Sequence, residues 1–394
     1  MNTSTSINSA TSLPQDILYE IFTRLSVKSI VRFRCVSKFC YSLVNNSFFA
    51  DVHRNRSLTC PGTSILLRLP SKTCQQVFYI VNLTEENHGK LQAHRVRYMD
   101  QQCFHNRVHL RAYFRCTKGL ICLANDDGDA AVCNPIIRQH VSLPRTRPVR
   151  PSTSQNFASA VLGFDSVSER YKVFMSELRC IHGRGDKKHW VLTLGEDESW
   201  REIIVPNYPE TSLHIDGVIY LINWTVKREI IAFNVGAEEF RTLPFPRELR
   251  HRTSSVLRSP WIEVAGRLAA VTVDHQWSRV EVWALEKSME WEKYMIPIPL
   301  EDRETIRKAC SMDFTGKCNG EIVMLIHVGE TFLIFVTAFG TPQVWRKFEI
   351  CGIHDRFICL DRVQNAIHII EENVFFPSSK TLNFQSNILT RRII

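Results

Sequence analysis

The sequence lacks long apolar runs and closely spaced cysteine pairs. No stretch of the 394 residues approaches the roughly 18 unbroken apolar residues of a membrane-spanning helix, so we expect no membrane contact. None of the thirteen cysteines is separated from another by only two residues, which argues against a zinc site. We therefore expect reduced cysteines that act as small core residues, with no bound metal and no cofactor.

A secretory signal is also missing. The first residues, "MNTSTSINSATS", are polar and uncharged, without the basic start and apolar run that such signals carry. We expect an intracellular protein of the cytoplasm or the nucleus.

Reaction motifs are absent too. The chain has no glycine-rich phosphate loop, no His-Glu-x-x-His and no Gly-x-Ser-x-Gly. The aspartates of "ANDDGDA" have the composition of a solvated turn, and His182, His189 and His214 would meet only by accident of folding. The sequence predicts a protein that is not an enzyme. An enzyme that processes glycans on a β scaffold is one alternative.

One compact helical segment stands near the start of the chain. Leu13, Ile17, Ile21 and Leu25 recur every four residues, which predicts a helix with a broad apolar face. Pro14 suits a first-turn position, where its missing N–H is not needed. We expect this helix to present Ile17 and Ile21 either to a partner or to the small core of the segment itself.

Two more short helices follow, with Ser26 and Ser37 as expected N-caps. A unit of about forty residues rarely buries all its apolar side chains without disulfides or a metal. The segment is therefore expected to dock on another protein through apolar contacts.

The same segment, "LPQDILYEIFTRLSVKSIVRFRCVSK", resembles the F-box motif in its plant form. The resemblance implies binding to the Skp-family adaptor and, through it, to a cullin. The implied adaptor-binding residues are Leu13, Pro14, Ile17, Ile21, Leu25, Val27, Ile30, Phe33 and Val36. Ser26, Cys40 and Ser47 replace a proline, a tryptophan and a proline of the motif, and the lost tryptophan would weaken adaptor binding if it were a contact.

Beyond about residue 60 the chain reads as strands. Apolar runs such as "SILLRL", "GLICLA", "GVIYLI", "EIVMLI" and "AIHII" are five to eight residues long, as is typical of strands, and turn residues separate them. No helical pattern of ten residues intervenes, which disfavours a nucleotide-binding α/β sheet.

An aromatic residue followed by an apolar run recurs at Trp200, Phe240, Trp291 and Trp345, at intervals of about 40 to 55 residues. Most of these runs end in proline. Such a period favours the blades of an irregular β-propeller over a pair of β-sandwiches. We expect the three tryptophans to be largely buried, each near the start of an equivalent strand.

Phrases of this region resemble the plant F-box-associated domain. They include "GLICLA", "GFDSVSERYKV", "GVIYLINW" and "IIAFNVGAEEFRTLPFP", in that order. The predicted organisation is a small all-α F-box of three short helices at residues 10–52, then a large all-β, propeller-like domain at residues 60–380. The two resemblances imply the substrate-recognition subunit of a Skp–cullin–F-box (SCF) ubiquitin ligase, which recruits a target protein for ubiquitination and proteasomal degradation.

The net charge of +9 is concentrated in short segments. Arg145, Arg147 and Arg150 follow one another in a proline-punctuated stretch, and Lys187 with Lys188 lies in another that we also expect to be a loop. These residues are the candidate target-binding residues, for an acidic target. A nucleic-acid-binding protein is a further alternative, disfavoured because the basic runs are short and lack regularly spaced aromatics.

Overall fold

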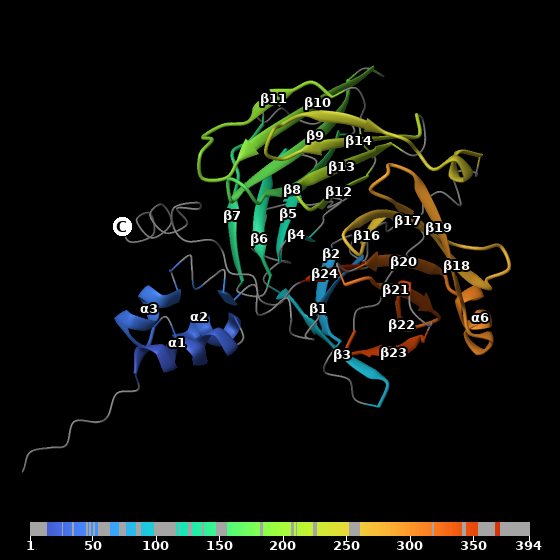
Figure 1. Cartoon of the computed structure of the whole chain (residues 1–394), viewed down its shortest axis with the longest axis horizontal. Helices are drawn as coiled ribbons and strands as arrows, with labels where there is room; N and C mark the ends of the chain where they lie inside the picture. The colour runs from blue at the N-terminus through green and yellow to red at the C-terminus, as the bar shows by residue number, and fades with distance from the viewer. Residues whose placement is uncertain are drawn as a thin grey trace, which may run out of the picture.

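The computed structural model describes residues 14–25, 27–33, 35–44, 46, 49, 52–53, 64–70, 76–83, 88–97, 116–117, 119–124, 128–135, 138–146, 156–181, 184–205, 209, 211–223, 227–251, 261–316, 319–340, 344–353 and 367–370. Figure 1 shows three short helices followed by a large β domain. Most described residues belong to strands, as the sequence predicted.

The N-terminal helices are α1 (Gln15–Arg24), α2 (Val27–Phe33) and α3 (Lys38–Val44). Pro14 immediately precedes α1, one residue earlier than expected, and its carbonyl accepts hydrogen bonds from the N–H groups of Ile17 and Leu18. Ser37 caps α3 as predicted, because its Oγ accepts a hydrogen bond from the Cys40 N–H at 3.1 Å. Ser26 lies outside the described residues. Pro14 at the start of α1 and Ser37 at the start of α3 therefore mark the beginnings of these helices in the sequence and in the structure.

The described strands of the β domain form four four-stranded sheets and one eight-stranded sheet. The four-stranded sheets are β4 (Cys116–Thr117) to β7 (Gln139–Ser142) through β5 (Leu120–Ala124) and β6 (Ala130–Asn134); β8 (Asn156–Asp165) to β11 (Arg201–Ile203) through β9 (Arg170–Ile181) and β10 (Arg184–Thr193); β12 (Thr211–Ile215) to β15 (Phe240–Leu243) through β13 (Val218–Asn223) and β14 (Glu229–Asn234); and β16 (Trp261–Val264) to β19 (Trp291–Pro297) through β17 (Arg267–Val273) and β18 (Arg279–Leu285). Each is an antiparallel meander.

The eight-stranded sheet consists of two such units. One is β20 (Ser311–Gly316), β21 (Glu321–Val328), β22 (Thr331–Ala338) and β23 (Arg346–Cys351). The other is β24 (Ile367–Ile370), β1 (Ser64–Pro70), β2 (Gln76–Asn82) and β3 (Lys90–Arg95). Strand β24, the last that the structure describes, thus completes the unit that β1, β2 and β3 begin. The two units join because β23 pairs with β3 in parallel, with Glu349 opposite Lys90.

The first strands of these units contact one another in a closed ring, in the order β4, β8, β12, β16, β20, β24 and back to β4. The described strands therefore form a β-propeller of six blades. We number the blades from blade 1 (β24, β1, β2, β3) to blade 6 (β20–β23). The closed ring of inner strands agrees with the predicted propeller and not with a pair of sandwiches.

The propeller has two ends. Turns from the first to the second strand of a blade, and from the third to the fourth, lie at one end, which we call the near end; Gly236 of one such turn packs on Asp165 of another. The chain enters the propeller there at Ser64 and leaves β24 there at Ile370, because these two residues are paired. The connections between blades, and the turns from second to third strands, lie at the opposite, far end.

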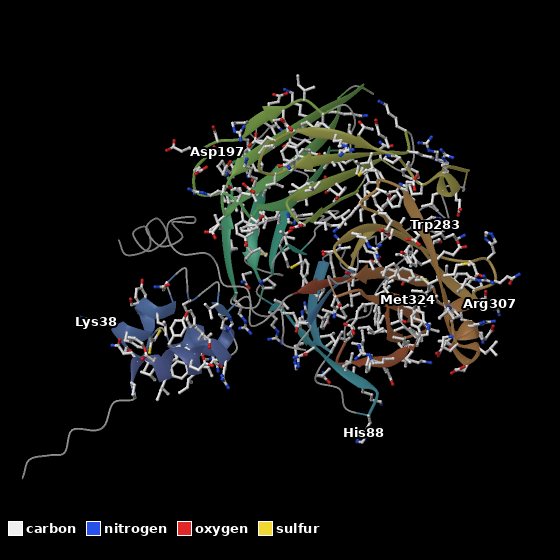
Figure 2. All side chains as sticks on the ribbon, in the orientation of Figure 1. Lys38, His88, Asp197, Trp283, Arg307 and Met324 are labelled. Atoms are coloured by element: carbon white, nitrogen blue, oxygen red, sulfur yellow. The ribbon has the colours of Figure 1, made fainter. Side chains whose placement is uncertain are left out.

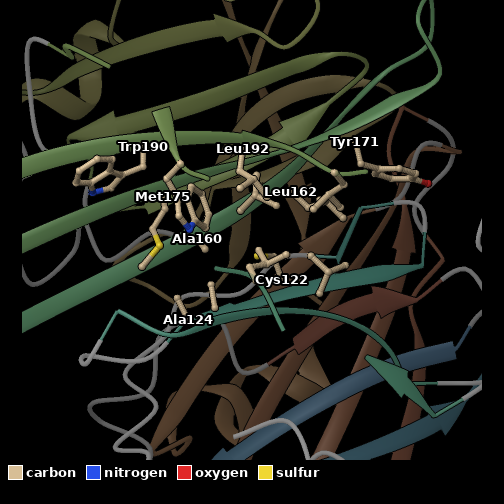
Figure 3. Packing of buried hydrophobic residues seen from close by; sticks show 14 of the residues in the cluster. Cys122, Ala124, Ala160, Leu162, Tyr171, Met175, Trp190 and Leu192 are labelled. Carbon is tan, nitrogen blue, oxygen red and sulfur yellow. The ribbon is translucent and has the colours of Figure 1, made fainter. Parts of the chain in front are cut away.

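Apolar side chains pack between successive blades. Figure 3 shows the contact of blades 2 and 3, where Cys122 and Ala124 of β5 pack with Ala160, Leu162 and Met175. All five residues of β5 are buried, because each blade has a neighbour on both faces. A strand that is covered on both faces reads as a continuous apolar run, which is why "GLICLA" was recognisable in the sequence.

The repeated aromatic residues link the outermost strands of neighbouring blades. Each of the three tryptophans stands at or just before the start of such a strand, and its indole N–H donates to a proline carbonyl at the end of the outermost strand of the preceding blade. The donor and acceptor pairs are Trp200 and Pro144 at 2.6 Å, Trp291 and Pro244 at 2.7 Å, and Trp345 and Pro297 at 2.7 Å. The repeat therefore marks a contact between blades.

The expectation that all three tryptophans are largely buried was wrong. Trp200 is buried as predicted, but Trp291 and Trp345 are only partly buried, because these outermost strands face solvent on one side. The sequence also gave no sign of α6 (Leu300–Arg307), which lies between blades 5 and 6, or of the 3-10 helix η1 (Arg247–His251) between blades 4 and 5. Both belong to far-end connections.

Candidate functional site

The outer surface of the helical segment is unusually apolar. Ile17 and Ile21, one turn apart on α1, are 47% and 41% exposed. Phe33, at the end of α2, is 37% exposed, and Val36, just beyond it, is 67% exposed. We call these four residues the exposed apolar set. Large apolar side chains gathered in so small a unit are typical of a surface that a protein partner covers.

The interior of the segment is filled by other residues. Phe22, Ile30, Cys40 and Phe49 form its buried core, and Tyr19 meets Phe49 edge to face at a ring-centroid distance of 5.5 Å. The core therefore uses one face of α1 and leaves the face of Ile17 free. Cys40 belongs to this core, so the missing tryptophan of the motif concerns internal packing rather than a surface contact.

The predicted adaptor-binding residues separate into three groups. Pro14, Ile17, Ile21, Phe33 and Val36 are exposed, Leu25 is half-buried, and Ile30 is fully buried in the core. Leu13 and the side chain of Val27 lie outside the described residues. Tyr41 of α3 is 46% exposed and was not among the predicted residues, because one exposed aromatic in a seven-residue helix leaves no periodic pattern.

Helix α1 carries three charged side chains. Glu20 and Arg24 form an ion pair at 2.7 Å across one turn, and Asp16 stands in the first turn. Figure 2 shows the side chains of this segment, with Lys38 labelled at the start of α3. Exposed helix pairs of this kind contribute about 0.3–0.5 kcal/mol to stability, so they support the helix without defining a binding site.

Some of the predicted target-binding residues already form contacts with other residues of the propeller. Arg145 donates from two guanidinium nitrogens to the carboxylate of Asp129, and Thr146 donates to Glu177. These contacts join the connection after β7 to the far ends of blades 2 and 3. Arg147 and Arg150, which follow in the same connection, lie outside the described residues.

Lys187 and Lys188 lie in strand β10 and not in a loop, which corrects the sequence interpretation. The reason is that β9 and β10 form a long hairpin in which Lys187 pairs with Leu178. Lys188 contacts both carboxylate oxygens of Glu202 at 2.7 and 2.8 Å, whereas Lys187 is exposed. The structure thus brings Arg145 and Lys187 to the same end of the propeller, on neighbouring blades.

The histidines do not form a common site. His189 is buried in blade 3, with its Nδ1 2.9 Å from Ser176 Oγ, and burial lowers its pKa to about 4, with a further contribution from Lys187. His214 instead accepts hydrogen bonds from the backbone N–H groups of Phe164 and Gly217. His182 lies outside the described residues. Each described histidine of this trio therefore has a local structural role.

One cysteine–histidine contact lies near the far end. Cys310 Sγ is 3.2 Å from His327 Nδ1, and the His327 ring stacks on Phe332 at a centroid distance of 4.3 Å. Burial lowers the pKa of His327, which disfavours the imidazolium form that an activating ion pair with a thiolate requires.

The described part of the chain contains no group of three or more His, Cys, Asp and Glu side chains arranged to hold a metal ion. Likewise, none of its helices is long and apolar enough to cross a bilayer.

Comparison with known proteins gives two family matches. Residues 11–50 match the F-box domain, and residues 65–374 match the F-box associated beta propeller domain. F-box protein At1g30790 of Arabidopsis thaliana is 29% identical over 376 residues, which cover 87% of this chain and 90% of that protein. Putative F-box protein At4g21240 of the same plant is 27% identical over 377 residues, covering 89% and 84%.

Among solved structures, the six-bladed fucose-recognising lectin of Aleuria aurantia superposes with a TM-score of 0.39 at 11% identity, covering 72% of this chain and 94% of the lectin chain. The propeller match covers well over half of the chain, and the helical segment matches separately. This chain belongs to the family of F-box proteins that carry an F-box associated β-propeller domain.

Proposed function

We propose that the chain is the substrate-recognition subunit of a Skp–cullin–F-box ubiquitin ligase. In this proposal the helical segment, residues 10–52, binds the Skp-family adaptor and through it a cullin. The β domain, residues 60–380, holds a target protein, so the chain acts by proximity and contributes no reacting group. Ubiquitination would then lead the target to the proteasome.

The observation that carries the proposal is the exposed apolar set on a segment whose core is already complete. Covering Ile17 and Ile21 would remove apolar surface from water and favour association by about 1–2 kcal/mol for each side chain. The described core of the segment is formed by other residues, so the exposed Ile17 and Ile21 are not needed to fill it. An adaptor that buries this face of the helix would explain why apolar residues stand there.

The test replaces Ile17 and Ile21 together with Asp and measures capture of a purified Skp-family adaptor. Because both side chains are exposed, the folded segment tolerates the change, and we expect capture to fall at least tenfold from the loss of about 2 kcal/mol or more of apolar contact. The matched control is Val167→Asp, an apolar residue that is 92% exposed on the propeller. Equal capture by the double variant and the control would contradict the proposal.

Target recognition is assigned to the β domain, with Arg145, Arg147, Arg150, Lys187 and Lys188 as the residues proposed from sequence. Their basic character suits an acidic target. A catalytic role for the domain has less support, since His189, His214 and Asp129 are engaged in structural contacts. Removal of residues 1–52 separates these functions: the truncated chain should lose the adaptor and keep the target.

A further inference from the structure

The far end of the propeller is free of chain connections to the rest of the protein. The polypeptide enters blade 1 at Ser64 and leaves it at Ile370, and these paired residues both lie at the near end. The helical segment and the C-terminal residues are therefore both attached to the near end. Within the described residues, a partner that approaches the far end meets the connections between blades and the turns between second and third strands.

Two acidic side chains that the structure describes at the far end of blades 4 and 5 are already engaged. Glu248 accepts a hydrogen bond from the Trp283 indole at 3.1 Å and lies 3.4 Å from Lys293 Nζ. Asp274 accepts hydrogen bonds from Ser278 and pairs with Arg279 at 3.3 Å, and these contacts lower its pKa against the opposing effect of burial. Their charges are thus largely balanced within the blades.

Several basic side chains of the same region are not balanced in this way. Within the described residues, Lys187 of blade 3, Lys227 of blade 4, and Arg247 and Arg250 of η1 are exposed and form no ion pair. The sequence adds Arg252 and Arg258 to the connection that contains η1, beyond its described part. We call Lys187, Lys227, Arg247 and Arg250 the far-end basic set.

The near end shows the opposite charge. Its exposed carboxylates without an ion pair in the described chain are Glu169, Glu198, Asp216, Glu239, Glu290 and Glu292, and its equivalent basic residues are Arg138, Arg241 and Lys287. Among the described residues of the far end the corresponding acids are Glu301 and Glu330, which belong to α6, between blades 5 and 6, and to blade 6. The charge of the propeller is therefore polarised between its ends.

From this arrangement we propose that the far end of blades 3 to 5 is a docking surface for a protein segment rich in Asp and Glu. The inference rests on the proposed function, because it identifies the kind of target that the propeller holds. The far-end basic set is spread over blade 3, blade 4 and η1, which follow one another around the ring. Positive charges spaced in this way suit a run of carboxylates rather than a single anion. A positive surface of this extent also accelerates encounter with an acidic partner.

Arg145 and Lys188 contribute less to this surface than the sequence indicated. Each already neutralises a carboxylate, of Asp129 and Glu202 respectively. A protein segment is favoured over single-stranded nucleic acid, because within the described propeller no aromatic ring is among the large apolar side chains exposed to solvent. Binding of single strands relies on such rings for base stacking.

The experiment uses the full chain in complex with its adaptor and measures fluorescence anisotropy of a labelled oligoglutamate peptide. The site variant is Lys187→Gln, Arg247→Gln and Arg250→Gln. The control variant is Arg138→Gln, Arg241→Gln and Lys287→Gln, which removes the same charge from the near end. We expect the site variant to weaken binding about tenfold or more and to flatten its salt dependence, and the control to change it less than about twofold.

Equal weakening by the two variants would overturn the proposal, since it would show attraction by net charge alone. Tighter binding of a labelled oligouridine than of oligoglutamate at the same salt would overturn it in favour of nucleic acid. If the intact complex bound no peptide, the docking proposal would also be overturned. The ligase role would stand in that case, because the chain would still hold the adaptor. If the chain bound the peptide but failed to capture the adaptor, only the ligase role would be refuted.

Discussion

The ties between outermost strands allow a prediction about what holds the blades together. Replacing Trp200 with Phe removes the indole N–H that donates to Pro144 and leaves the rest of an aromatic ring in place. A typical hydrogen bond contributes about 0.5–1.5 kcal/mol to stability. Trp200 is 9% exposed, so loss of the second ring adds about 1–2 kcal/mol of lost burial and cavity. The expected loss in free energy of unfolding is about 2–3 kcal/mol.

The same replacement at Trp345 should cost less. Its indole makes an equivalent bond to Pro297 at 2.7 Å, but the ring is only partly buried, so about 1 kcal/mol is expected, mostly from the bond. Trp277 supplies the control, since it is also half-buried but its indole forms no hydrogen bond within the described residues. Trp277→Phe should therefore cost less than Trp345→Phe.

Urea unfolding of the full chain, followed by far-UV circular dichroism, measures these differences without relying on tryptophan fluorescence. The reasoning predicts the order Trp200, then Trp345, then Trp277. A Trp200→Phe variant within about 0.5 kcal/mol of the unmodified chain would refute it, because the bond and the buried ring together exceed that value. A Trp277→Phe variant as unstable as Trp345→Phe would also refute it, since the hydrogen bond from the Trp345 indole to Pro297 would then contribute nothing to stability.

Two further predictions concern contacts between blades. Hydrogen bonds from Arg201, then from Lys172, hold the pKa of Glu238 at about 2, below its ordinary 4.5, despite the opposing effect of burial. The stabilisation is therefore present above pH 4.5 and lost as the pH falls toward 2; Glu238→Gln should flatten that part of the unfolding free energy by about 1–2 kcal/mol, and an unchanged acid profile would contradict this. A Cβ on Gly316 would lie 1.9 Å from the Glu263 carbonyl oxygen, so Gly316→Ala should cost about 2–4 kcal/mol in thermal or urea unfolding. At Gly266, where space is open, Ala should cost only about 1 kcal/mol for its positive φ, and equal losses at the two glycines would argue against a clash.

Much of this fold could be predicted because its signals are local. Ser37 caps its helix through its own side chain, and the strands of "GLICLA" and "EIVMLI" are continuous apolar runs that are buried on both faces. The aromatic repeat was visible because each copy makes the same contact with the blade before it. Helix α6 was missed because only Leu300 and Ile306 are apolar in its eight residues, too few to show a helical period.

What depends on distant parts of the chain could not be predicted. The spacing of Ile17 and Ile30 in the helical segment does not reveal that one is exposed and the other fully buried, since this depends on how three helices cross. Nor does the spacing of Arg145 and Asp129 predict their ion pair, which forms because β6 and β7 return the chain to the same end of blade 2. The charge polarity between the two ends has the same origin.

The closure of blade 1 by β24 has a consequence for synthesis on the ribosome. The helical segment leaves the ribosome first and has its own core, whereas β1 must wait for Ile367–Ile370, some 300 residues later, before its open edge is paired. A nascent or prematurely terminated chain would therefore display a finished helical segment beside an unsealed propeller. Under the function proposed above, such a fragment would compete for the adaptor while delivering no target, and it would depend on chaperones to keep the unpaired strand from aggregating.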